Sequence, residues 1–458
     1  MKVVFVVMDT LRPDHLGCYG YSRRTSPRLD ALAKQSALFE RVYATDVPTQ
    51  PSYTAMFTGS RGIRTGVVSH SPAEDLPDAT PYLSEIMARG GHVTGAVSTL
   101  YFMKKYFARG FHTYMNPVAN DRARLQQVTA AEINAYALPW LRAHADRDFF
   151  LFLHYWDPHA IYKPPEAKYR TMFWKRGDPT DPADKSLAAL DKQFVGPFMR
   201  AHLDRIRPGI TSAEYVISQY DGEIRYVDTK FGEVLDLLQE LGLEKETLLI
   251  VTSDHGESMT EHDHFFDHVS VYEQVVRLPL LIRWPGRLSG GRRVSALVQN
   301  IDIAPTILEA AGIEKPEAME GRSLLPLGRG ETDTGYPFVV SNQGAWQAKR
   351  MICDGRWKLI RAIDNGYWPA PARELYDLER DPSETQNLVG DEPAKAAELE
   401  LRLRRWEEAE LRGKLDPIAK IADSGLPSRP WVEAAAKQGG LQISYEEYRN
   451  LIDVPYTV

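Results

Sequence analysis

The chain has 458 residues, of which 43% are hydrophobic and 26% are charged, and its formal net charge is −7. This composition is typical of a soluble globular protein, and the negative charge excludes a general attraction to nucleic acid or anionic membranes. The two cysteines exclude a disulfide framework and fit a reducing compartment. A chain of this length predicts one large α/β domain and a smaller one.

The first predicted element is a strand at residues 2–8, an apolar and β-branched run typical of a parallel strand buried on both faces. It ends at Asp9, and ligands of open α/β sheets bind at the carboxyl ends of strands. Asp9 is therefore a candidate site residue, although an Asp that caps the next turn is the alternative. The run is too short for a signal sequence or a membrane span, and no other stretch has about 18 apolar residues. Without a signal sequence or a membrane span, we expect a cytoplasmic protein. The sequence also contains no nucleic-acid-binding motif.

A Pro-rich segment at residues 47–59 follows a predicted helix (28–36) and a short strand (39–44). Prolines favour the first turn of a helix, which we predict over residues 52–57 with Gly59 as its end. The Thr49 hydroxyl would lie just before this helix, where the helix dipole stabilises anions. The functional interpretation is a Thr nucleophile beside an anion site, and the alternative is an ordinary Thr in a turn.

In the middle of the chain we predict a helix at 83–88, a strand at 92–98 and a helix at 130–144. A second buried strand is predicted after them, at residues 148–155. This strand contains His154 and runs into Asp157-Pro158-His159, so that His159 also lies at a strand end. A surface His is the alternative. Residues 162–210 have no clear periodicity, which indicates a covering insertion or surface decoration.

The third buried strand is predicted at residues 247–252, after a long helix at 211–241. It ends in Asp254 and His255, the most specific local signal of the chain, because carboxylate and imidazole are good ligands for Zn²⁺ or Mn²⁺. Beyond them, residues 261–268 contain three His and three acidic residues. They could form a metal site or an ordinary polar loop, and we expect only some to be functional.

The last part of the chain changes in pattern after a Gly-rich linker near residue 330. A strand (276–284) and a helix (301–311) precede the linker, and short antiparallel strands (338–341, 348–354, 357–361) and a helix (393–411) follow it. We predict three parts: a catalytic domain (1–330), a subdomain with an antiparallel sheet and a closing helix (331–412), and an irregular tail (413–458). The tail could be an arm onto another subunit, and we expect a homo-oligomer.

Taken together, these motifs resemble the sulfatase family of the alkaline phosphatase superfamily. The matching segments are residues 9–14, 26–33, 49–59, 157–159, 252–257, 272–280, 302–306 and 374–388. The resemblance implies an α/β fold with a large, mostly parallel central sheet flanked by helices, and a smaller C-terminal α+β domain on a short antiparallel sheet.

Departures from the sulfatase pattern bear on the function. Thr49 occupies the position of the Cys or Ser that sulfatases oxidise to formylglycine, and Thr cannot give that aldehyde because its β-carbon carries a methyl group. Tyr53 replaces the signature Arg, His268 replaces a sulfate-binding Lys, and Thr10 replaces the second acid of an Asp pair. A Thr nucleophile with Asp and His ligands instead resembles the phosphotransferase and phosphodiesterase branches.

The resemblance therefore implies a metal-dependent hydrolase of a small anionic ester, a phosphodiester or phosphonate monoester, without formylglycine. The expected ligands of one divalent ion, Zn²⁺ or Mn²⁺ before Ca²⁺, are Asp9, Thr10, Thr49, Asp254 and His255. Thr49 would form a phospho-threonine, and His159 or His268 would bind substrate oxygens or protonate the leaving group.

Further substrate contacts are expected from Tyr53, His154 and Lys358. Residues 162–210 and the second domain, around Gln343, Trp346 and Lys358, would select the leaving group. A second metal ion is a less favoured alternative that surplus Asp and His residues would allow. The competing functions are a sulfatase that uses an unmodified Thr and a non-catalytic relative that binds an anion.

Overall fold

The computed structural model describes residues 1–71 and 73–438, and within these residues it forms two β-sheets. The larger sheet has eight strands in the order β5-β4-β6-β1-β7-β8-β2-β9. Their bounds are β1 (Lys2–Met8), β2 (Ala37–Tyr43), β4 (Val93–Val97), β5 (Thr113–Met115), β6 (Phe149–Tyr155), β7 (Thr247–Thr252), β8 (Arg277–Arg283) and β9 (Arg293–Gln299). Only β8 runs antiparallel to its neighbours among the described strands. The predicted mostly parallel sheet is confirmed.

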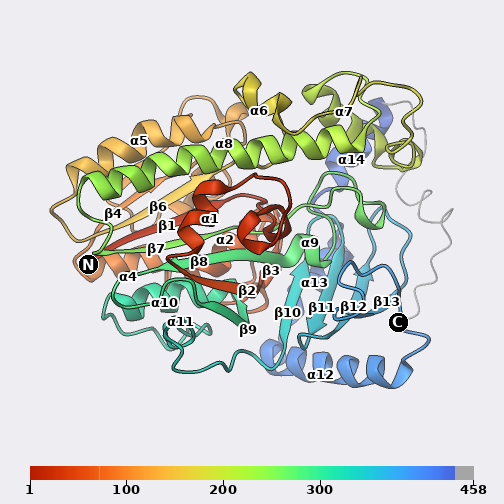
Figure 1. Cartoon of the computed structure of the whole chain (residues 1–458). Helices are drawn as coiled ribbons and strands as arrows, with labels where there is room; N and C mark the ends of the chain where they lie inside the picture. The colour runs from red at the N-terminus through yellow and green to blue at the C-terminus, as the bar shows by residue number, and fades with distance from the viewer. Residues whose placement is uncertain (72, 439–458) are drawn as a thin grey trace.

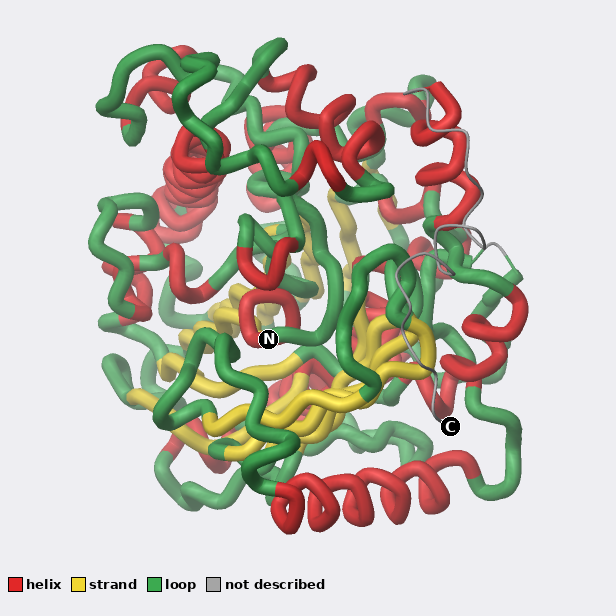
Figure 2. The backbone as a smooth tube through the Cα atoms, turned by 90° about the vertical axis from the view of Figure 1, so that its right-hand side faces the viewer, coloured by secondary structure: helices red, strands yellow, loops and turns green. Residues whose placement is uncertain are grey.

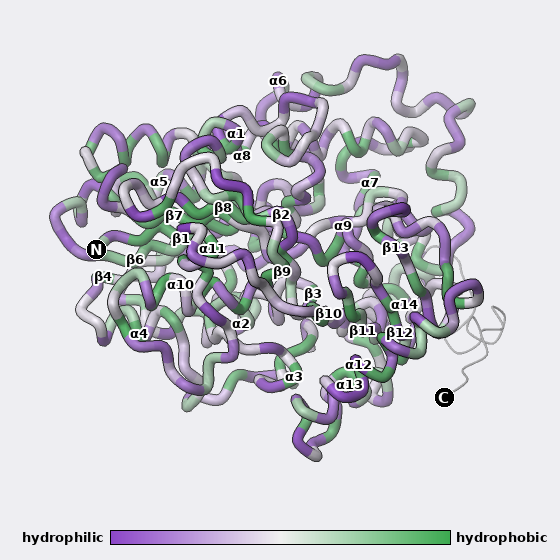
Figure 3. The backbone as a smooth tube through the Cα atoms, turned by 60° about the horizontal axis from the view of Figure 1, so that its bottom comes forward, coloured by the Kyte–Doolittle hydropathy of each residue, from purple (hydrophilic) through white to green (hydrophobic). Residues whose placement is uncertain are grey.

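Helices cover both faces of this sheet, as Figure 1 shows. One face packs against α1 (Pro27–Ala33), α5 (Ala130–Ala143) and α8 (Ala213–Glu240), and the other packs against α2 (Thr49–Thr58), α4 (Leu83–Arg89) and α10 (Ile303–Ala310). Successive side chains of β1 alternate between these two cores: Val4 and Val6 lie in the first, Val3 and Phe5 in the second. The central strands are accordingly hydrophobic along their length (Figure 3).

Side-chain caps begin the long helices on the first face. Thr129 and Glu132 form a reciprocal capping box at the start of α5. Ser212 accepts a hydrogen bond from the Tyr215 amide at the start of α8, which has 28 residues. These caps explain why both helices begin within two residues of the predicted positions.

The smaller sheet has the order β13-β12-β11-β10-β3 among the described residues. Its strands are β3 (Asp46–Val47), β10 (Val339–Gln343), β11 (Ala348–Cys353), β12 (Trp357–Asp364) and β13 (Arg373–Asp377). Strands β10 to β12 are antiparallel as predicted, and β13, which was not predicted, pairs antiparallel with β12. Helix α12 (Pro393–Leu411) packs its Leu399 and Leu403 against this sheet. In Figure 2 this helix lies along the lower edge, below the strands.

Strand β3 was not predicted, and it joins the smaller sheet by pairing parallel with β10. Because β3 lies immediately before Thr49, the smaller sheet helps to hold the Thr49 segment against the end of the larger sheet. The boundary at residue 330 remains a prediction, since the sheet after it also contains this N-terminal strand.

The remaining helices lie in loops and in the tail. They are α3 (Gly62–Thr65), α6 (Ala167–Met172), α7 (Gly196–Ile206), α9 (Glu273–Val276), α11 (Leu325–Arg329), α13 (Pro417–Ser424) and α14 (Arg429–Gln438). No helix among the described residues has the length and apolar content needed to cross a membrane.

The prediction of an irregular tail is wrong for its described part, which forms α13 and α14. Pro417 and Pro430 stand in first helical turns, where the missing N–H costs nothing, whereas Pro427 lies in the turn between the two helices. Asp416 caps the Ile418 amide. Ile418 and Val432 are fully buried against the rest of the protein. Residues 439–458 lie outside the described residues, and the oligomerisation arm stays a prediction.

Candidate active site

The predicted metal ligands Asp9, Asp254 and His255 lie together, just after the ends of two neighbouring strands. Strands β1 and β7 pair in parallel, with Val7 opposite Thr252, so that Asp9 and Asp254 leave the sheet side by side. One ligand atom each of Asp9, Asp254 and His255 lies within 4.8 Å of the others, and all three side chains are fully buried. The structure therefore brings together the three strongest predicted ligands.

The ring of His255 is held in one orientation by the backbone. Its Nδ1 lies 2.9 Å from the Gly256 carbonyl and donates to it, which leaves the lone pair of Nε2 facing the site. That Nε2 is 3.2 Å from Asp254 Oδ2 and 3.2 Å from Thr49 Oγ1. Burial lowers the pKa of His255 to about 4, so the ring is neutral at pH 7. A neutral imidazole that presents Nε2 beside a carboxylate is the form that binds a metal ion.

The carboxylates of this site accept few hydrogen bonds from the surrounding protein. Both oxygens of Asp9 and the Oδ2 of Asp254 are buried without a hydrogen-bond partner among the described residues. Burial raises the pKa of Asp9 well above its usual range, and the neighbouring Asp254 raises it further. Two buried acids with lone pairs converging on a neutral imidazole need a cation, and the donor set fits a divalent ion.

Thr10 is placed beside these ligands by a strained backbone. Its φ is 55°, in the left-handed region, and its amide donates to Asp254 Oδ1 over 3.2 Å. Its Oγ1 is buried without a hydrogen-bond partner in the described structure, consistent with a further oxygen donor. As a metal ligand Thr10 stays a prediction.

Thr49 is the first residue of α2, which begins three residues earlier than predicted and ends at Gly59 with φ 60°. Its hydroxyl therefore lies at the positive end of a ten-residue helix rather than just before it. Ser52, in the first turn, donates to the Asp254 carbonyl over 2.6 Å and so fixes this helix against the end of β7. Only 2% of Thr49 is exposed.

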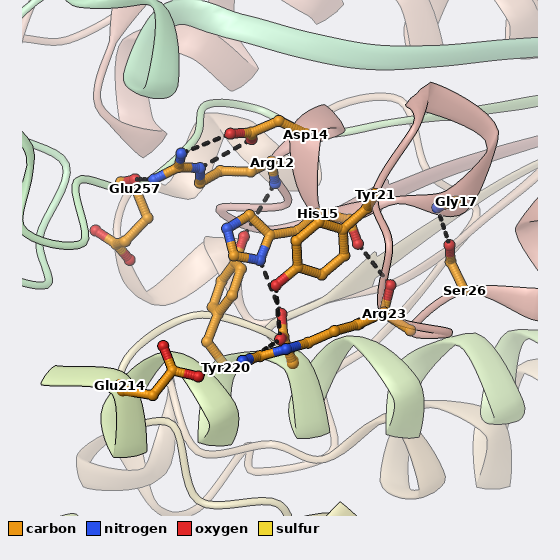
Figure 4. Close-up of polar contacts among 12 residues, drawn as sticks. Arg12, Asp14, His15, Gly17, Tyr21, Arg23, Ser26, Glu214, Tyr220 and Glu257 are labelled. Carbon is orange, nitrogen blue, oxygen red and sulfur yellow. Dashed lines mark hydrogen bonds and ion pairs between the residues drawn. The ribbon is translucent and has the colours of Figure 1, made fainter. Parts of the chain in front are cut away.

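A second layer of contacts fixes the segment after β1 (Figure 4). The Tyr220 hydroxyl, from α8, donates to the Thr10 carbonyl over 2.7 Å and accepts from the Arg12 amide over 3.0 Å. The Arg12 guanidinium donates to the Glu257 carbonyl over 2.8 Å. Helix α8 thus holds the ends of β1 and β7 in register.

His268 and His159 approach the same point from a loop and from the end of β6. The rings of His268 and His255 are 4.6 Å apart, and those of His268 and His159 are 5.9 Å apart. Burial alone would lower the pKa of His268, but Asp267 (3.0 Å) and Glu257 (3.6 Å) raise it to about 9, whereas burial lowers the pKa of His159 well below its usual range. The site therefore combines a cationic and a neutral imidazole.

Tyr53 and His154, which were expected to contact substrate, lie in the core next to Asp9. Both are fully buried, and their rings pack 5.1 Å apart. His154 Nε2 lies 3.4 Å from Asp9 Oδ2, and Asp9 and Asp254 raise the pKa of the Tyr53 phenol in addition to the effect of burial. Helix α2 and strand β6 place both side chains in the core beside the Asp9 carboxylate, and their direct contact with substrate stays a prediction.

The surroundings of Lys358 do not support the prediction that it binds substrate. Lys358 lies on β12, is fully buried, and forms ion pairs with Glu273 (3.0 Å) and Glu384 (2.8 Å). The sequence showed a Lys in the second domain but not the two acids that surround it.

The three histidines of the loop at residues 261–268 lie in different surroundings. His262 stacks on Tyr272 with ring centroids 3.6 Å apart, and His264 packs edge-on against Trp368. Of its histidines, only His268 borders the cavity described below.

The structure adds residues that sequence reasoning did not assign. Gln50, His70 and Glu257 line a cavity of about 610 Å³ that also reaches His159 and His268. The oxygens of Glu257 are buried close to His268. Gln50 could have been found from its place next to Thr49, whereas nothing in the sequence distinguishes His70.

Comparisons with known proteins agree with the observed fold. The family model described as Sulfatase matches residues 2–313, and the model described as N-sulphoglucosamine sulphohydrolase, C-terminal, matches residues 260–410. Arylsulfatase K of Xenopus laevis is 26% identical over 435 residues, which are 82% of this chain and 77% of that protein.

Two further similar proteins are named for the alkaline phosphatase superfamily and for phosphonate monoester hydrolysis. The multifunctional alkaline phosphatase superfamily protein PehA of Trinickia caryophylli is 32% identical over 294 residues, which are 57% of this chain and 55% of that protein. The crystal structure of the phosphonate monoester hydrolase of Agrobacterium radiobacter superposes with a TM-score of 0.72 at 21% identity, covering 89% of this chain and 96% of that one.

Proposed function

This chain belongs to the sulfatase family, and from that premise we propose that it is a metal-dependent hydrolase of phosphodiesters or phosphonate monoesters with Thr49 as its nucleophile. The observation that carries the proposal is the position of the Thr49 hydroxyl. It stands at the N-terminus of α2, 3.2 Å from the lone pair of His255 Nε2 and beside the buried Asp254.

Asp9, Asp254 and His255 would hold one divalent ion, with Thr10 and Thr49 as further oxygen donors. Zn²⁺ or Mn²⁺ suits carboxylate and imidazole ligands better than Ca²⁺, which prefers oxygen alone. When bound, such an ion lowers the pKa of a coordinated hydroxyl and neutralises charge on the ester.

Residues of the chain act as the nucleophile and help to protonate the leaving group. Thr49 Oγ attacks phosphorus, its proton passes to water, and the bond from phosphorus to the leaving-group oxygen breaks in line. The leaving oxygen takes its bonding electron pair and a proton from His268 or from a water that His159 orders. Water then attacks the phospho-threonine and releases Thr49. The N-terminus of α2 stabilises the negative charge that develops on the transferring group.

A sulfate ester hydrolase that uses an unmodified Thr is the second candidate, and the similarity to arylsulfatase K supports it. We favour phosphorus because a Thr at position 49 cannot become formylglycine. A non-catalytic anion-binding protein is the third candidate. The buried ligand set and the hydroxyl beside it argue against that role. Cytoplasmic location and homo-oligomerisation stay predictions.

The test is hydrolysis by wild type, Thr49→Ala and Thr49→Ser of matched p-nitrophenyl esters: a phosphodiester, a phosphonate monoester and a sulfate, each with added Mn²⁺, Zn²⁺ or Ca²⁺. We expect Thr49→Ala to lose at least about 1,000-fold in kcat and Thr49→Ser to retain activity. Mass spectrometry of acid-quenched wild type should find phosphate or phosphonate on Thr49.

Wild-type turnover by Thr49→Ala would refute the nucleophile. A sulfate rate above both phosphorus rates would favour the second candidate. Protein that binds no metal and turns over none of the three esters would favour the third.

A further inference from the structure

The cavity of about 610 Å³ is far larger than a phosphoryl group needs. It extends from Gln50, His159 and His268 to an outer wall built by α7, α14 and the segment after β10. Ligand pockets that enclose most of a drug-sized molecule have volumes of this order. Its shape and chemistry therefore bear on the leaving group rather than on the reacting atoms.

The outer wall is mainly apolar and aromatic. Phe198 of α7 and Trp346 pack edge to face with ring centroids 5.5 Å apart, and Trp431 of α14, 50% exposed, borders the same space, as does Phe102. Flat aromatic surfaces favour a ring system, which gains from burial and ring stacking. Trp346 lies in the region from which sequence reasoning expected leaving-group selection.

Two arginines stand at the mouth of this cavity. Arg122 and Arg205 come from separate segments, both are exposed, and neither forms an ion pair with any residue that the structure describes. The acids at the reacting end, Glu257 and Asp267, are instead close to His268. Guanidinium groups bind carboxylates and phosphates through paired hydrogen bonds. The mouth therefore offers unused positive charge to an anion that is remote from the scissile ester.

We infer that the leaving group is an apolar, ring-containing alcohol or phenol that carries a second anionic group. Its ring packs on Phe198, Trp346 and Trp431, and its anion binds Arg122 and Arg205. The placement of the ester end rests on the proposed function, whereas the pocket itself does not. A sugar acid would share the anion but would bury less apolar surface against the three aromatic rings.

Binding of the released alcohol tests this inference without turnover. Calorimetry on metal-loaded protein should compare 6-hydroxy-2-naphthoate with 2-naphthol, which lacks the anion, and with glucuronate, which lacks the aromatic ring. We expect the naphthoate to bind about tenfold or more tightly than 2-naphthol and glucuronate to bind most weakly. The double variant Arg122→Ala/Arg205→Ala should abolish the preference for the naphthoate, and Trp346→Ala should weaken both naphthols alike.

The matched control is Arg124→Ala, which removes a neighbouring arginine that pairs with Glu132 outside the cavity. It should change none of the three affinities. Equal binding of naphthoate and naphthol by the wild type, or tighter binding of glucuronate than of either naphthol, would overturn the inference. Because Thr49→Ala should keep this binding pattern, loss of the proposed catalysis and loss of the pocket specificity are separate outcomes.

Discussion

Two pairs of acids in this protein, one of them fully buried and the other mostly buried, have opposite surroundings. Glu273 and Glu384 share Lys358, whose Nζ lies 3.0 and 2.8 Å from their oxygens. Asp9 and Asp254 are at least as deeply buried, yet no Lys or Arg forms an ion pair with either in the described residues, and the adjacent imidazoles of His154 and His255 are neutral.

The difference separates a structural acid pair from a ligand site. An acid pair that the chain neutralises itself links elements of the fold, here α9 and β12. An acid pair that is left without a cation destabilises the metal-free protein, and binding of a cation removes this destabilisation. The first pair should therefore respond to mutation through stability and the second through metal binding.

The largest expected effect is from Lys358→Met, which leaves the fully buried Glu384 and the partly exposed Glu273 without their cation. We expect a loss of about 3–5 kcal/mol in the free energy of unfolding, measured by urea denaturation. The double variant Lys358→Met/Glu384→Gln should recover part of this loss. The exposed Lys168→Met is the control and should change stability by less than about 0.5 kcal/mol. A Lys358→Met protein as stable as wild type would show that the two pairs do not differ as described.

Metal binding should stabilise the Asp9–Asp254 site next most strongly. At a concentration of Zn²⁺ or Mn²⁺ 100 times the dissociation constant, the gain is about 2.7 kcal/mol, visible as a rise in Tm after chelation and reloading. Asp254→Asn should abolish the rise, and Glu384→Gln should leave it unchanged. An unchanged rise in Asp254→Asn would place the ion elsewhere.

The free energy of unfolding should also depend on pH through Glu384, which interacts with Lys358. This effect should be smaller than the stabilisation by metal. Burial raises the pKa of Glu384 to about 7, with Glu273 adding to the shift and Lys358 opposing it. A carboxyl whose folded pKa exceeds its unfolded value takes up a proton on folding, so its contribution to stability falls as pH rises from about 4.5 to 7. Wild type should therefore lose about 2 kcal/mol more than Glu384→Gln between pH 5 and 7.5. Parallel profiles of the two proteins would contradict the shift.

The smallest expected effect is an increase in the free energy of unfolding rather than a loss. In metal-free protein, Asp254→Asn removes one of two uncompensated acids while its Oδ1 can still accept the Thr10 amide. We expect an increase in unfolding free energy of about 1 kcal/mol, together with loss of activity. Chelated samples of both proteins, unfolded in urea, provide the measurement. A less stable Asp254→Asn would mean that the acid pair is not a source of strain.

The parts of the fold that sequence patterns predicted are those whose signal is local. Strands β1 and β7 and helix α12 have the predicted bounds, because buried parallel strands are continuous apolar runs and helices have periodic faces. Strand β9 was missed because it lies at a sheet edge, where Arg293 and Ser295 are exposed and break the pattern. The tail helices were missed because a proline in a first turn and a proline in a loop look alike in sequence.

By itself, the sequence determined that polar residues follow three buried strands, and the parallel order of those strands was enough to bring Asp9, Asp254 and His255 together. Only the tertiary structure decided which acids obtain a cation from the chain. Lys358 and the acids around it are separated by many residues, and side-chain contacts at such separation depend on packing. The same reason places Tyr53 and His154 beside the Asp9 carboxylate, and Arg122 and Arg205 at the mouth of the cavity.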